Sequence, residues 1–538
     1  MQNDQPANCK IQSNRPILFA SGLLVLAVVA YCLIVLLLNS GHLVFTLDDA
    51  YIHLALAENI MQGHYGINLN EYSAPASSIL WPFFIAPFAG LTIANYIILI
   101  ANTIFALITL LLLWVTLSPE NTDASSEGDA EQQALLGAML ILSIPACNLI
   151  GLVFTGMEHS LQVMLAVAIV CGLSRESSTS RLDWWTLPAI IIAPLVRYEC
   201  LAISLPAAGY LMLRGHRRSG IATIAIIVAS IAGFSWFLTS LGQSPLPNSV
   251  RAKSQIVYER NASSVFTNFS TGIEDSRGLL LAVFLLFLVS QMSNRKLERG
   301  KRILCATVSF SIILHLLFGQ FSVFCRYEIY IWASALATAG FISKPLIYGN
   351  SSNFRMFEKS LFMFFSLFLL CFPHIIILAN IPVASNNIYE QHYQMHRFVA
   401  EFYKKPVAAN DIGFLSYRNS EYILDLWGLA SSKALSSRHL ANNENWMEDL
   451  VQSKNIGLAI IYDNLFLSVP DSWNKLGMLH LGKRKITAAR DRVAFYATRK
   501  ESLQDIRSLL EKFVLTLPEG VKFVFADNAD SEVLNGEM

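Results

Sequence analysis

Long apolar runs without charge constrain this chain more than any other feature. The first, Pro16–Leu38, contains no charged residue, and about 20 apolar residues suffice for a helix to cross the hydrocarbon core of a bilayer. The run is too long for a signal-peptide core and has no convincing cleavage site, so we expect a retained helix. Charged residues make up 14% of the chain, against about 25% in soluble domains. The sequence therefore predicts a polytopic α-helical membrane protein.

About eleven spans can be placed in the first 380 residues. Lys10 and Arg15 precede the first span and predict a cytoplasmic N-terminus, because basic residues concentrate on the inner side. Basic clusters at 214–218 and 294–302 then also fall inside. The expected spans are 17–39, 95–117, 134–155, 157–173, 186–197, 200–213, 219–240, 278–292, 303–320, 326–345 and 359–380.

Two of these spans, 186–197 and 200–213, are short for ordinary crossings. They could form one long tilted helix, or a V-shaped pair with Arg197 and Glu199 at its outer tip. The V is preferred, because both flanks are basic. The remaining topology places four segments on the outer side: the loop 40–94, the turn 155–159, the loop 241–277 and everything after about 381.

The tail, 381–538, is polar enough to fold in water as a small α/β domain. Ser502–Leu515 has apolar residues at helical spacing. Expected strands are 422–426, 456–462, 492–497 and 522–526. We thus expect two domains, a transmembrane catalytic module over 1–380 and an extracytoplasmic domain over 381–538.

Charge and cysteine usage exclude several classes of function. The formal net charge is zero, so no basic excess points to nucleic acid. The eight cysteines are scattered, several within apolar runs, and no CxxC occurs. They are typical of small core residues and not of a disulfide or zinc framework.

The segment Phe45–Gly63 carries an acidic pair, Asp48-Asp49, just after the first span. Thr46 is expected to cap a helix that Gly63 ends. On its own the pair could simply complement the helix dipole. Adjacent carboxylates repel, however, unless a proton or a cation lies between them, which makes one of them a candidate base with a shifted pKa.

Ionisable residues recur in apolar surroundings on the same predicted side. Each alone is more simply a structural ion pair or a snorkelling cation. Basic groups that converge on an acidic pair suit a membrane-anchored phosphate. The cations are Arg197, Arg251, Lys253 and Arg326, and Glu199 and Glu328 accompany the first and last of them.

Glu158 also lies at the outer edge, where it could bind a substrate hydroxyl or cap the following helix. His53 and His159 could be metal ligands, but lone histidines are more often structural, and neither HxxxH nor HExxH occurs. The acidic pair beside His53 could hold a divalent cation, although no ligand set is complete. No metal site or other cofactor is predicted.

Several motifs occur in an order that resembles a known family. Residues 48–52 read Asp-Asp-Ala-Tyr-Ile, and 71–81 read Glu-Tyr-Ser-Ala-Pro-Ala-Ser-Ser-Ile-Leu-Trp. Later come Thr-Gly-Met-Glu158, Val-Arg-Tyr-Glu199, Pro-Asn-Ser-Val-Arg-Ala-Lys253, Asn-Asp-Ile-Gly413 and Leu-Asp-Leu-Trp-Gly-Leu429. Together they resemble the GT-C glycosyltransferases, in particular the mycobacterial terminal β-(1→2)-arabinofuranosyltransferase and its bacterial relatives. Tyr198 and Arg251 depart from the family pattern, so arabinose specificity is not carried over.

The resemblance implies transfer of a sugar from a polyprenyl-phosphate donor to an envelope glycan or glycolipid, at the outer face of a bacterial cytoplasmic membrane. Asp48 would be the base that deprotonates the acceptor, and Asp49 would orient the acceptor or support the base. Arg197, Arg251, Lys253 and Arg326 would hold the donor phosphate. Substrate contacts would come from His53, Tyr72, Glu158, Glu199 and Asn248.

Two other functions remain open from the sequence. A secondary transporter or lipid flippase would use a similar bundle, but no inverted repeat or paired interrupted spans are visible. A catalytically inactive binding or scaffold protein would keep the fold without the chemistry.

Overall fold

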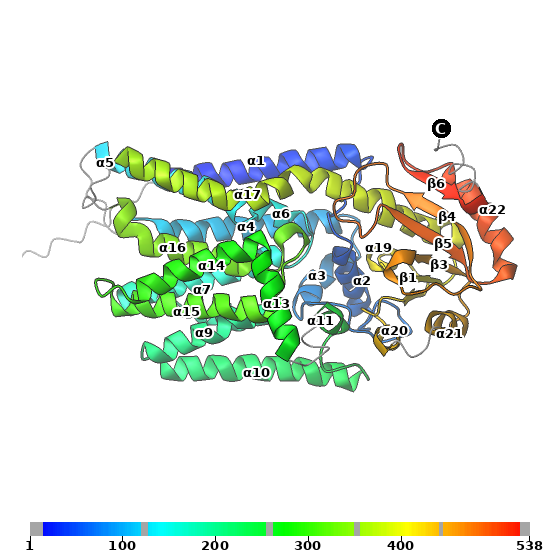
Figure 1. Cartoon of the computed structure of the whole chain (residues 1–538), viewed down its shortest axis with the longest axis horizontal. Coiled ribbons are helices and arrows are strands. Elements are labelled where there is room, and N and C mark those ends of the chain that lie inside the picture. Colours follow the sequence, from blue (N-terminus) through cyan, green and yellow to red (C-terminus); the bar gives the residue numbers. More distant parts are fainter. Residues whose placement is uncertain (1–13, 120–126, 254–261, 349–355, 441–444, 528–538) are drawn as a thin grey trace, which may run out of the picture.

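A helical bundle joined at one end to a small sheet domain makes up the molecule (Figure 1). The computed structural model describes residues 14–119, 127–253, 262–348, 356–440 and 445–527. Lys10, used above for orientation, lies outside these ranges. The bundle helices run side by side along the long axis, and the sheet lies beyond their ends.

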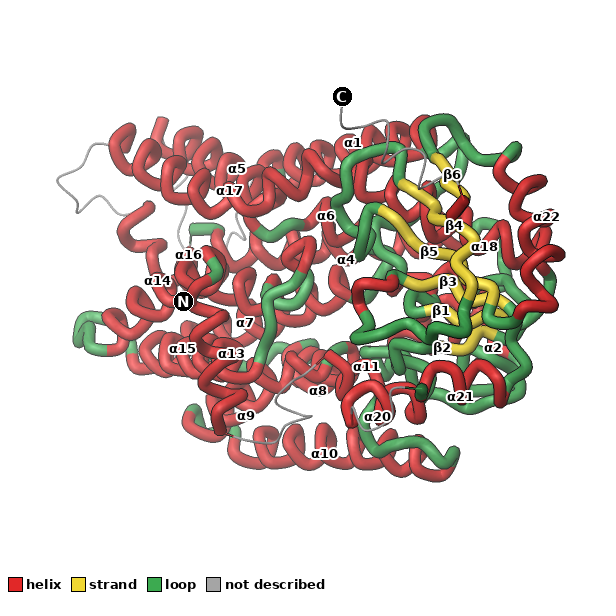
Figure 2. The backbone as a smooth tube through the Cα atoms, turned by 45° about the vertical axis from the view of Figure 1, so that its right-hand side comes forward, coloured by secondary structure: helices red, strands yellow, loops and turns green. Residues whose placement is uncertain are grey.

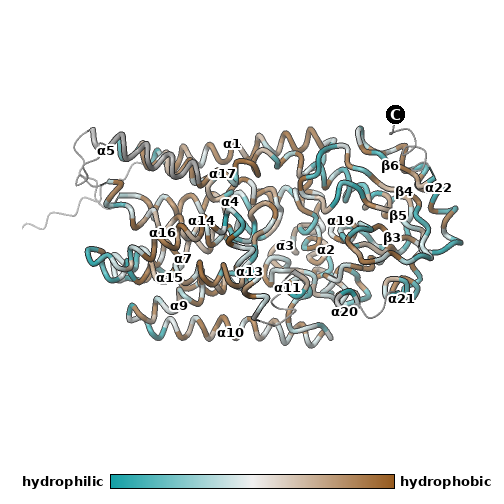
Figure 3. The backbone as a smooth tube through the Cα atoms, in the orientation of Figure 1, coloured by the Kyte–Doolittle hydropathy of each residue, from teal (hydrophilic) through white to brown (hydrophobic). Residues whose placement is uncertain are grey.

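Six helices within the described ranges are long and apolar enough to cross a membrane. Large apolar side chains on them face outward, as on α1, where Phe19 and Leu37 are exposed, and apolar residues are spread along the bundle in Figure 3. Such a surface is expected against lipid and not against water. The chain is therefore a polytopic helical membrane protein. The six are α1 (Arg15–Leu38), α4 (Ala94–Leu117), α7 (His159–Thr179), α10 (Arg217–Ser240), α15 (Arg299–Phe318) and the continuous helix Leu370–Tyr403.

The other expected spans also lie on helices. The span predicted over 134–155 is divided in two, because Asn148 adopts a left-handed conformation (φ 50°) between its halves. These helices are α5 (Glu127–Ala146), α6 (Leu149–Val153), α8 (Thr186–Val196), α9 (Leu201–Leu213), α14 (Ser276–Met292), α16 (Ile329–Tyr348) and α17 (Met356–Ile388). Two further helices, α11 (Asn248–Lys253) and α13 (Ala262–Glu274), lie in the loop predicted over 241–277.

The V-shaped pair is confirmed. Helix α8 ends at Val196, Arg197 is extended (φ −150°, ψ 132°), and the chain turns through Tyr198–Cys200 into α9. The arms run in opposite directions, because Arg214 after α9 returns to Glu176 near the end of α7 (2.9 Å). At 1.5 Å per residue each arm is about 16–20 Å long, so the tip does not reach through the full hydrocarbon thickness of about 30 Å.

Between the bundle and the sheet lie α2 (Asp49–Met61) and α3 (Trp81–Ala89) (Figure 1). Helix α2 is buried along most of its length. The expected cap was wrong: Asp48 precedes the helix, and Thr46 instead donates its hydroxyl to the Phe154 carbonyl (3.2 Å). Gly63, at φ +77°, follows the end of α2 as predicted.

One helix continues from the bundle into the sheet domain. After α17 it passes through η3 (Tyr389–Tyr393), α18 (Gln394–Arg397) and η4 (Phe398–Tyr403), where η3 and η4 are π-helical turns. The last span was expected to end at 380, so the expected domain boundary falls inside this helix.

The sheet has six strands in the order β2-β1-β3-β5-β4-β6, parallel among the first three and antiparallel in the rest (Figure 2). All four expected strands are confirmed, whereas β1 and β4 were not predicted. The strands are β1 (Val407–Ala409), β2 (Ile423–Asp425), β3 (Leu458–Ile461), β4 (Asn474–His480), β5 (Arg492–Ala497) and β6 (Lys522–Phe525).

Helices cover both faces of the sheet. The predicted amphipathic helix is α22 (Leu503–Val514), which packs Ile506 and Leu510 against one face together with the end of the long helix. Helices α20 (Ser432–Leu440) and α21 (Trp446–Ser453) cover the other face. A short helix, α19 (Gly413–Ser416), follows β1 and packs on α2.

Candidate active site

The acidic pair lies where α2 meets the sheet domain. Both carboxylate oxygens of Asp48 accept backbone hydrogen bonds at 2.8 Å, one from Gly413 and one from Phe414. The ring of Phe414 packs on Tyr51 one turn into α2 (ring centroids 3.8 Å). These contacts orient Asp48 and fix the sheet domain on the start of α2.

Two further ionisable groups lie beside Asp48. His392 is buried and contacts Asp411 through Nε2 (3.0 Å), and Asp411 follows strand β1. Burial raises the pKa of Asp48 to about 6, nearby His392 opposes that rise, and Asp411 adds to it. A carboxyl group with a pKa near the working pH is suited to take up a proton.

Asp49 contacts a cation from the other side of the bundle. Its Oδ2 lies 3.0 Å from Nη1 of Arg326, which follows a turn where Phe324 and Cys325 have positive φ angles (63° and 50°). The Asn148 side chain holds this turn by donating to the Phe324 carbonyl (2.8 Å). Strained, fixed backbone of this kind concentrates at functional sites.

Tyr327 connects the acidic pair to a second charged cluster. Two guanidinium groups lie near its ring, that of Arg326 at 5.0 Å and that of Arg197 at 4.8 Å from the ring centroid. Each distance is within the range of a cation–π contact. Arg326 and Arg197, which were predicted to converge, therefore contact the same aromatic ring.

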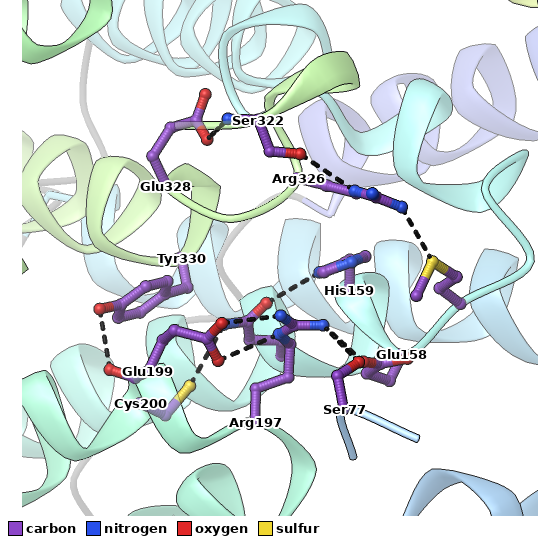
Figure 4. Close-up of polar contacts among 12 residues, drawn as sticks. Ser77, Glu158, His159, Arg197, Glu199, Cys200, Ser322, Arg326, Glu328 and Tyr330 are labelled. Carbon is purple, nitrogen blue, oxygen red and sulfur yellow. Dashed lines mark hydrogen bonds and ion pairs between the residues drawn. The ribbon is translucent and has the colours of Figure 1, made fainter. Parts of the chain in front are cut away.

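Arg197, at the tip of the V, is buried between two carboxylates (Figure 4). Nη1 lies 2.7 Å from Glu158, and Nη2 lies 2.7 Å from Glu199. Ser77 accepts a further hydrogen bond from Nη1 (3.1 Å). Most of the Arg197 donors are thus already used by the protein. His53 lies 3.7 Å from the second Glu158 oxygen. Glu158 is the N-cap residue of α7, but its side chain makes no capping hydrogen bond and pairs with Arg197 instead.

A cavity of about 340 Å³ opens beside this cluster. Its polar end contains Arg197, Glu199 and Tyr327, and Tyr330 donates to the Glu199 carbonyl (2.9 Å). Its opposite wall is formed by apolar side chains of α9 and α15, among which Leu205 and Phe318 are exposed. The cavity therefore joins a charged site to a lipid-facing surface.

Asn248 and Arg251, both predicted to contact substrate, do not line the cavity themselves. Arg251 lies in α11, whose Ser249 and Val250 line the cavity, and donates to Asn248 (3.3 Å). Asn248 donates to Ser432 in α20 (3.0 Å) and so links α11 to the sheet domain. The side chain of Lys253 lies outside the described part of the chain.

Tyr72 is also separate from the cavity. It is partly exposed and stacks on His64 (ring centroids 4.5 Å). His159 is held by Gln162 (3.1 Å) and packs near Tyr327. Among the described residues, no group of three or more His, Cys, Asp or Glu side chains is arranged to hold a metal ion.

Sequence reasoning missed three side chains at this site. Tyr327 lies between Arg326 and Glu328 in the sequence. Its aromatic ring, next to a selected arginine, could have indicated a cation–π contact. Asp411 is part of the Asn-Asp-Ile-Gly413 motif but had no assigned role. It lies two residues after the parallel strand β1, and functional side chains commonly lie at such strand ends. His392 had no local signal, because its burial beside Asp48 depends on the long helix continuing past residue 380.

Another missed residue, Arg277, explains Glu328. Glu328 is buried and pairs with Arg277, which also binds Asp275 at the start of α14 (2.7 Å). This pair joins the segments around Ser276 and Ser322 and is separate from the Asp48 site.

Known proteins provide only distant comparisons. Residues 386–496 match a domain of unknown function (DUF8728), and no curated protein matches the chain. A structure of ArnT from Cupriavidus metallidurans bound to undecaprenyl phosphate has 11% identity and a TM-score of 0.47, covering 89% of this chain and 98% of that one. The Archaeoglobus fulgidus oligosaccharyltransferase in the apo form has 12% identity and a TM-score of 0.42, covering 85% and 73%. At these TM-scores the likeness assigns neither a fold family nor a function to this chain.

Proposed function

We propose that this protein is a membrane glycosyltransferase of the GT-C type, which transfers a sugar from a polyprenyl-phosphate donor to an envelope glycan or lipid-linked acceptor. The observation that carries the proposal is the connection through Tyr327. Tyr327 contacts both Arg197, which lines the cavity, and Arg326, which contacts Asp49 of the acidic pair. The motif resemblance noted in the sequence supports the same reaction class.

The donor lies with its lipid between α9 and α15, where exposed apolar side chains face the membrane. Its phosphate is held by Arg326, and Arg251 and Lys253 remain predicted phosphate contacts. Arg197 is largely neutralised by Glu158 and Glu199, so it chiefly positions these carboxylates. Glu199 lines the cavity and is available to bind sugar hydroxyls. A cation near the phosphate stabilises the charge that develops on the leaving group.

Asp48 acts as the general base. It takes the proton of an acceptor hydroxyl as that oxygen forms a bond to the anomeric carbon, while the bond from this carbon to the phosphate oxygen breaks. The polyprenyl phosphate leaves as a monoester. A carboxylate has about four lone-pair positions, so the two backbone hydrogen bonds to Asp48 leave room for the acceptor. Asp49, held by Arg326, orients the acceptor hydroxyl.

The site then faces the outside of the cell. Basic clusters at 214–218 and 294–302 lie where α9 meets α10 and where α14 meets α15, at the end of the bundle away from the sheet (Figure 1). Their cytoplasmic placement puts the sheet domain, the acidic pair and the cavity at the outer face of a bacterial cytoplasmic membrane.

Replacing Asp48 tests the function. In cells that carry only Asp48→Asn, we expect lipid-linked sugar donors to accumulate and one envelope glycan to lose its terminal sugar, measured by mass spectrometry. Asp471→Asn removes an exposed carboxylate of the tail and should behave as wild type. Normal transfer by Asp48→Asn would overturn the mechanism. A transporter would instead show substrate-dependent uptake into vesicles that does not depend on this pair.

A further inference from the structure

A second, larger cleft of about 780 Å³ lies at the other end of α2. It is formed by Glu58–Gln62 at the end of α2, the loop 67–70, the end of α3 and the loop 416–422 of the sheet domain. Its volume is within the range of about 300–1,000 Å³ typical of small-molecule sites. The cleft is distinct from the cavity at Arg197, with which it shares no lining residue.

Polar side chains with spare hydrogen-bonding capacity line this cleft. Gln62, Asn70 and Glu421 make no side-chain hydrogen bond or ion pair within the part of the chain that the structure describes, and Gln62 and Asn70 are exposed. Amide groups both donate and accept, and a carboxylate accepts, which suits a ligand rich in hydroxyl groups. Exposed Met61 and Leu69 lie among these groups and offer apolar surface to the C–H faces of sugar rings.

The charge of the cleft disfavours anionic ligands. Its charged side chains are Glu58, Glu421 and Arg418, a formal balance of one negative charge. The Arg418 guanidinium is already engaged, because it donates to the Leu91 carbonyl and its Nε lies 3.9 Å from Glu58. A phospholipid headgroup or a nucleotide would therefore meet no free cation here.

The adjacent sheet edge is closed to peptides. Strand β2 is an edge strand, which could accept an extended peptide as an added strand. The Asn68 side chain occupies that edge, because it accepts from the N–H of Ile423 (2.9 Å) and donates to its carbonyl (3.0 Å). The main-chain groups that would recognise a peptide at Ile423 are thus already paired.

We propose that this cleft binds a glycan, namely the part of the acceptor that lies several sugars away from the reacting hydroxyl. The inference rests on the proposed glycosyltransferase function. Helix α2 joins the two sites: Glu58 is ten residues beyond Asp48, about 15 Å at 1.5 Å per residue. The cleft therefore contributes to acceptor affinity and selects acceptors longer than one or two sugars.

Photo-crosslinking in the native membrane tests occupancy directly. A benzophenone amino acid is introduced at Gln62 or Asn70 in the full-length protein and irradiated in cells that assemble the native envelope. Leu467 and Leu515, exposed residues of the sheet domain outside the cleft, serve as matched control positions. We expect periodate-sensitive carbohydrate adducts at 62 and 70 and none at 467 or 515. A polypeptide adduct, a phospholipid adduct, no adduct, or equal labelling at the controls would overturn the proposal.

Kinetics separate this inference from the proposed function. In the double variant Gln62→Ala/Asn70→Ala, we expect the KM for a long acceptor glycan to rise about tenfold with unchanged kcat, and no change for a one-sugar acceptor. An equal effect on both acceptors, or a loss of kcat, would contradict a remote acceptor subsite. The crosslinking is repeated in Asp48→Asn. Glycan adducts together with transfer that does not depend on Asp48 would support the binding site and reject the proposed mechanism.

Discussion

Asp48 and Gly413 are 365 positions apart in the sequence, yet the backbone N–H of Gly413 donates a 2.8 Å hydrogen bond to the Asp48 carboxylate. The start of α2 and the loop after β1 are therefore parts of one site. The sheet domain is therefore part of the site around Asp48, because the same loop also supplies Asp411 and the Phe414 N–H.

Gly413 is the first test of this relationship. A Cβ at this position would lie 2.1 Å from the Asp48 carbonyl oxygen and 2.6 Å from its Oδ2, so Gly413→Ala must displace the carboxylate. We expect transfer to be lost and the free energy of unfolding to fall by about 1–3 kcal/mol, measured by thermal unfolding in nanodiscs. Gly209→Ala in α9, where a Cβ meets nothing within 4 Å, is the control. Wild-type transfer by Gly413→Ala would show that Asp48 need not be held in this position.

The pH dependence of transfer follows from the surroundings of Asp48. Burial raises its pKa to about 6, and only the ionised form is a base, so the rate should rise with a midpoint near pH 6. His392 lowers this pKa and Asp411 raises it. His392→Gln should therefore move the midpoint upward, and Asp411→Asn should move it downward. A midpoint at the usual aspartate value in all three proteins would remove Asp48 as the base.

The ion pair between Arg326 and Asp49 can be measured with a double-mutant cycle. Arg326→Gln and Asp49→Asn should each reduce transfer, but the double variant should lose less than the product of the two effects. For a contacting pair the expected coupling is about 0.5–3 kcal/mol. Arg326→Lys keeps the charge without the planar fork and should recover only part of the activity. Fully additive losses would mean that the 3.0 Å contact does not matter in the working enzyme.

Stability should depend strongly on the carboxylate partners of Arg197. Glu158 is fully buried and lies 2.7 Å from Arg197, so Glu158→Gln leaves a buried cation partly uncompensated. Removing one partner of a buried pair costs about 3–5 kcal/mol, and we expect a large fall in thermal stability. Glu511→Gln removes an exposed i,i+4 partner of Arg507, for which about 0.3–0.5 kcal/mol is typical. Similar losses in both variants would contradict the role assigned to the buried cluster.

Much of the fold was predictable because it depends on local pattern. Apolar length placed the bundle helices, and the basic flanks of 186–213 favoured the V over a tilted helix. Four strands and α22 followed from alternation and helical spacing. Strands β1 and β4 were missed for different reasons: Val407–Ala409 is only three residues long, and Asn474–His480 begins with polar residues and contains Gly477.

The ionisable residues of the site could be identified from the sequence, but most of the contacts between them could not. The sequence indicated which ionisable residues stand in apolar surroundings, and the structure brings Arg326 to Asp49 and Arg197 to Glu158. It could not show that Arg197 is engaged by two carboxylates, because the pairing depends on the tertiary meeting of α7, α8 and the loop after α2. The role of Asp48 as an acceptor for the Gly413 N–H depends in the same way on the docked sheet domain.

The helix Leu370–Tyr403 connects the membrane to this centre without a break. The chain is already helical from Met356, and at 1.5 Å per residue the helix up to Tyr403 is more than twice as long as the hydrocarbon core of about 30 Å is thick, so part of it extends beyond the lipid. His392 lies on the projecting part, and the chain enters β1 immediately after it. In the proposed mechanism this helix sets the height of the Asp48 carboxylate above the bilayer, and an acceptor reacts only if its anchor and its length bring a hydroxyl to that height.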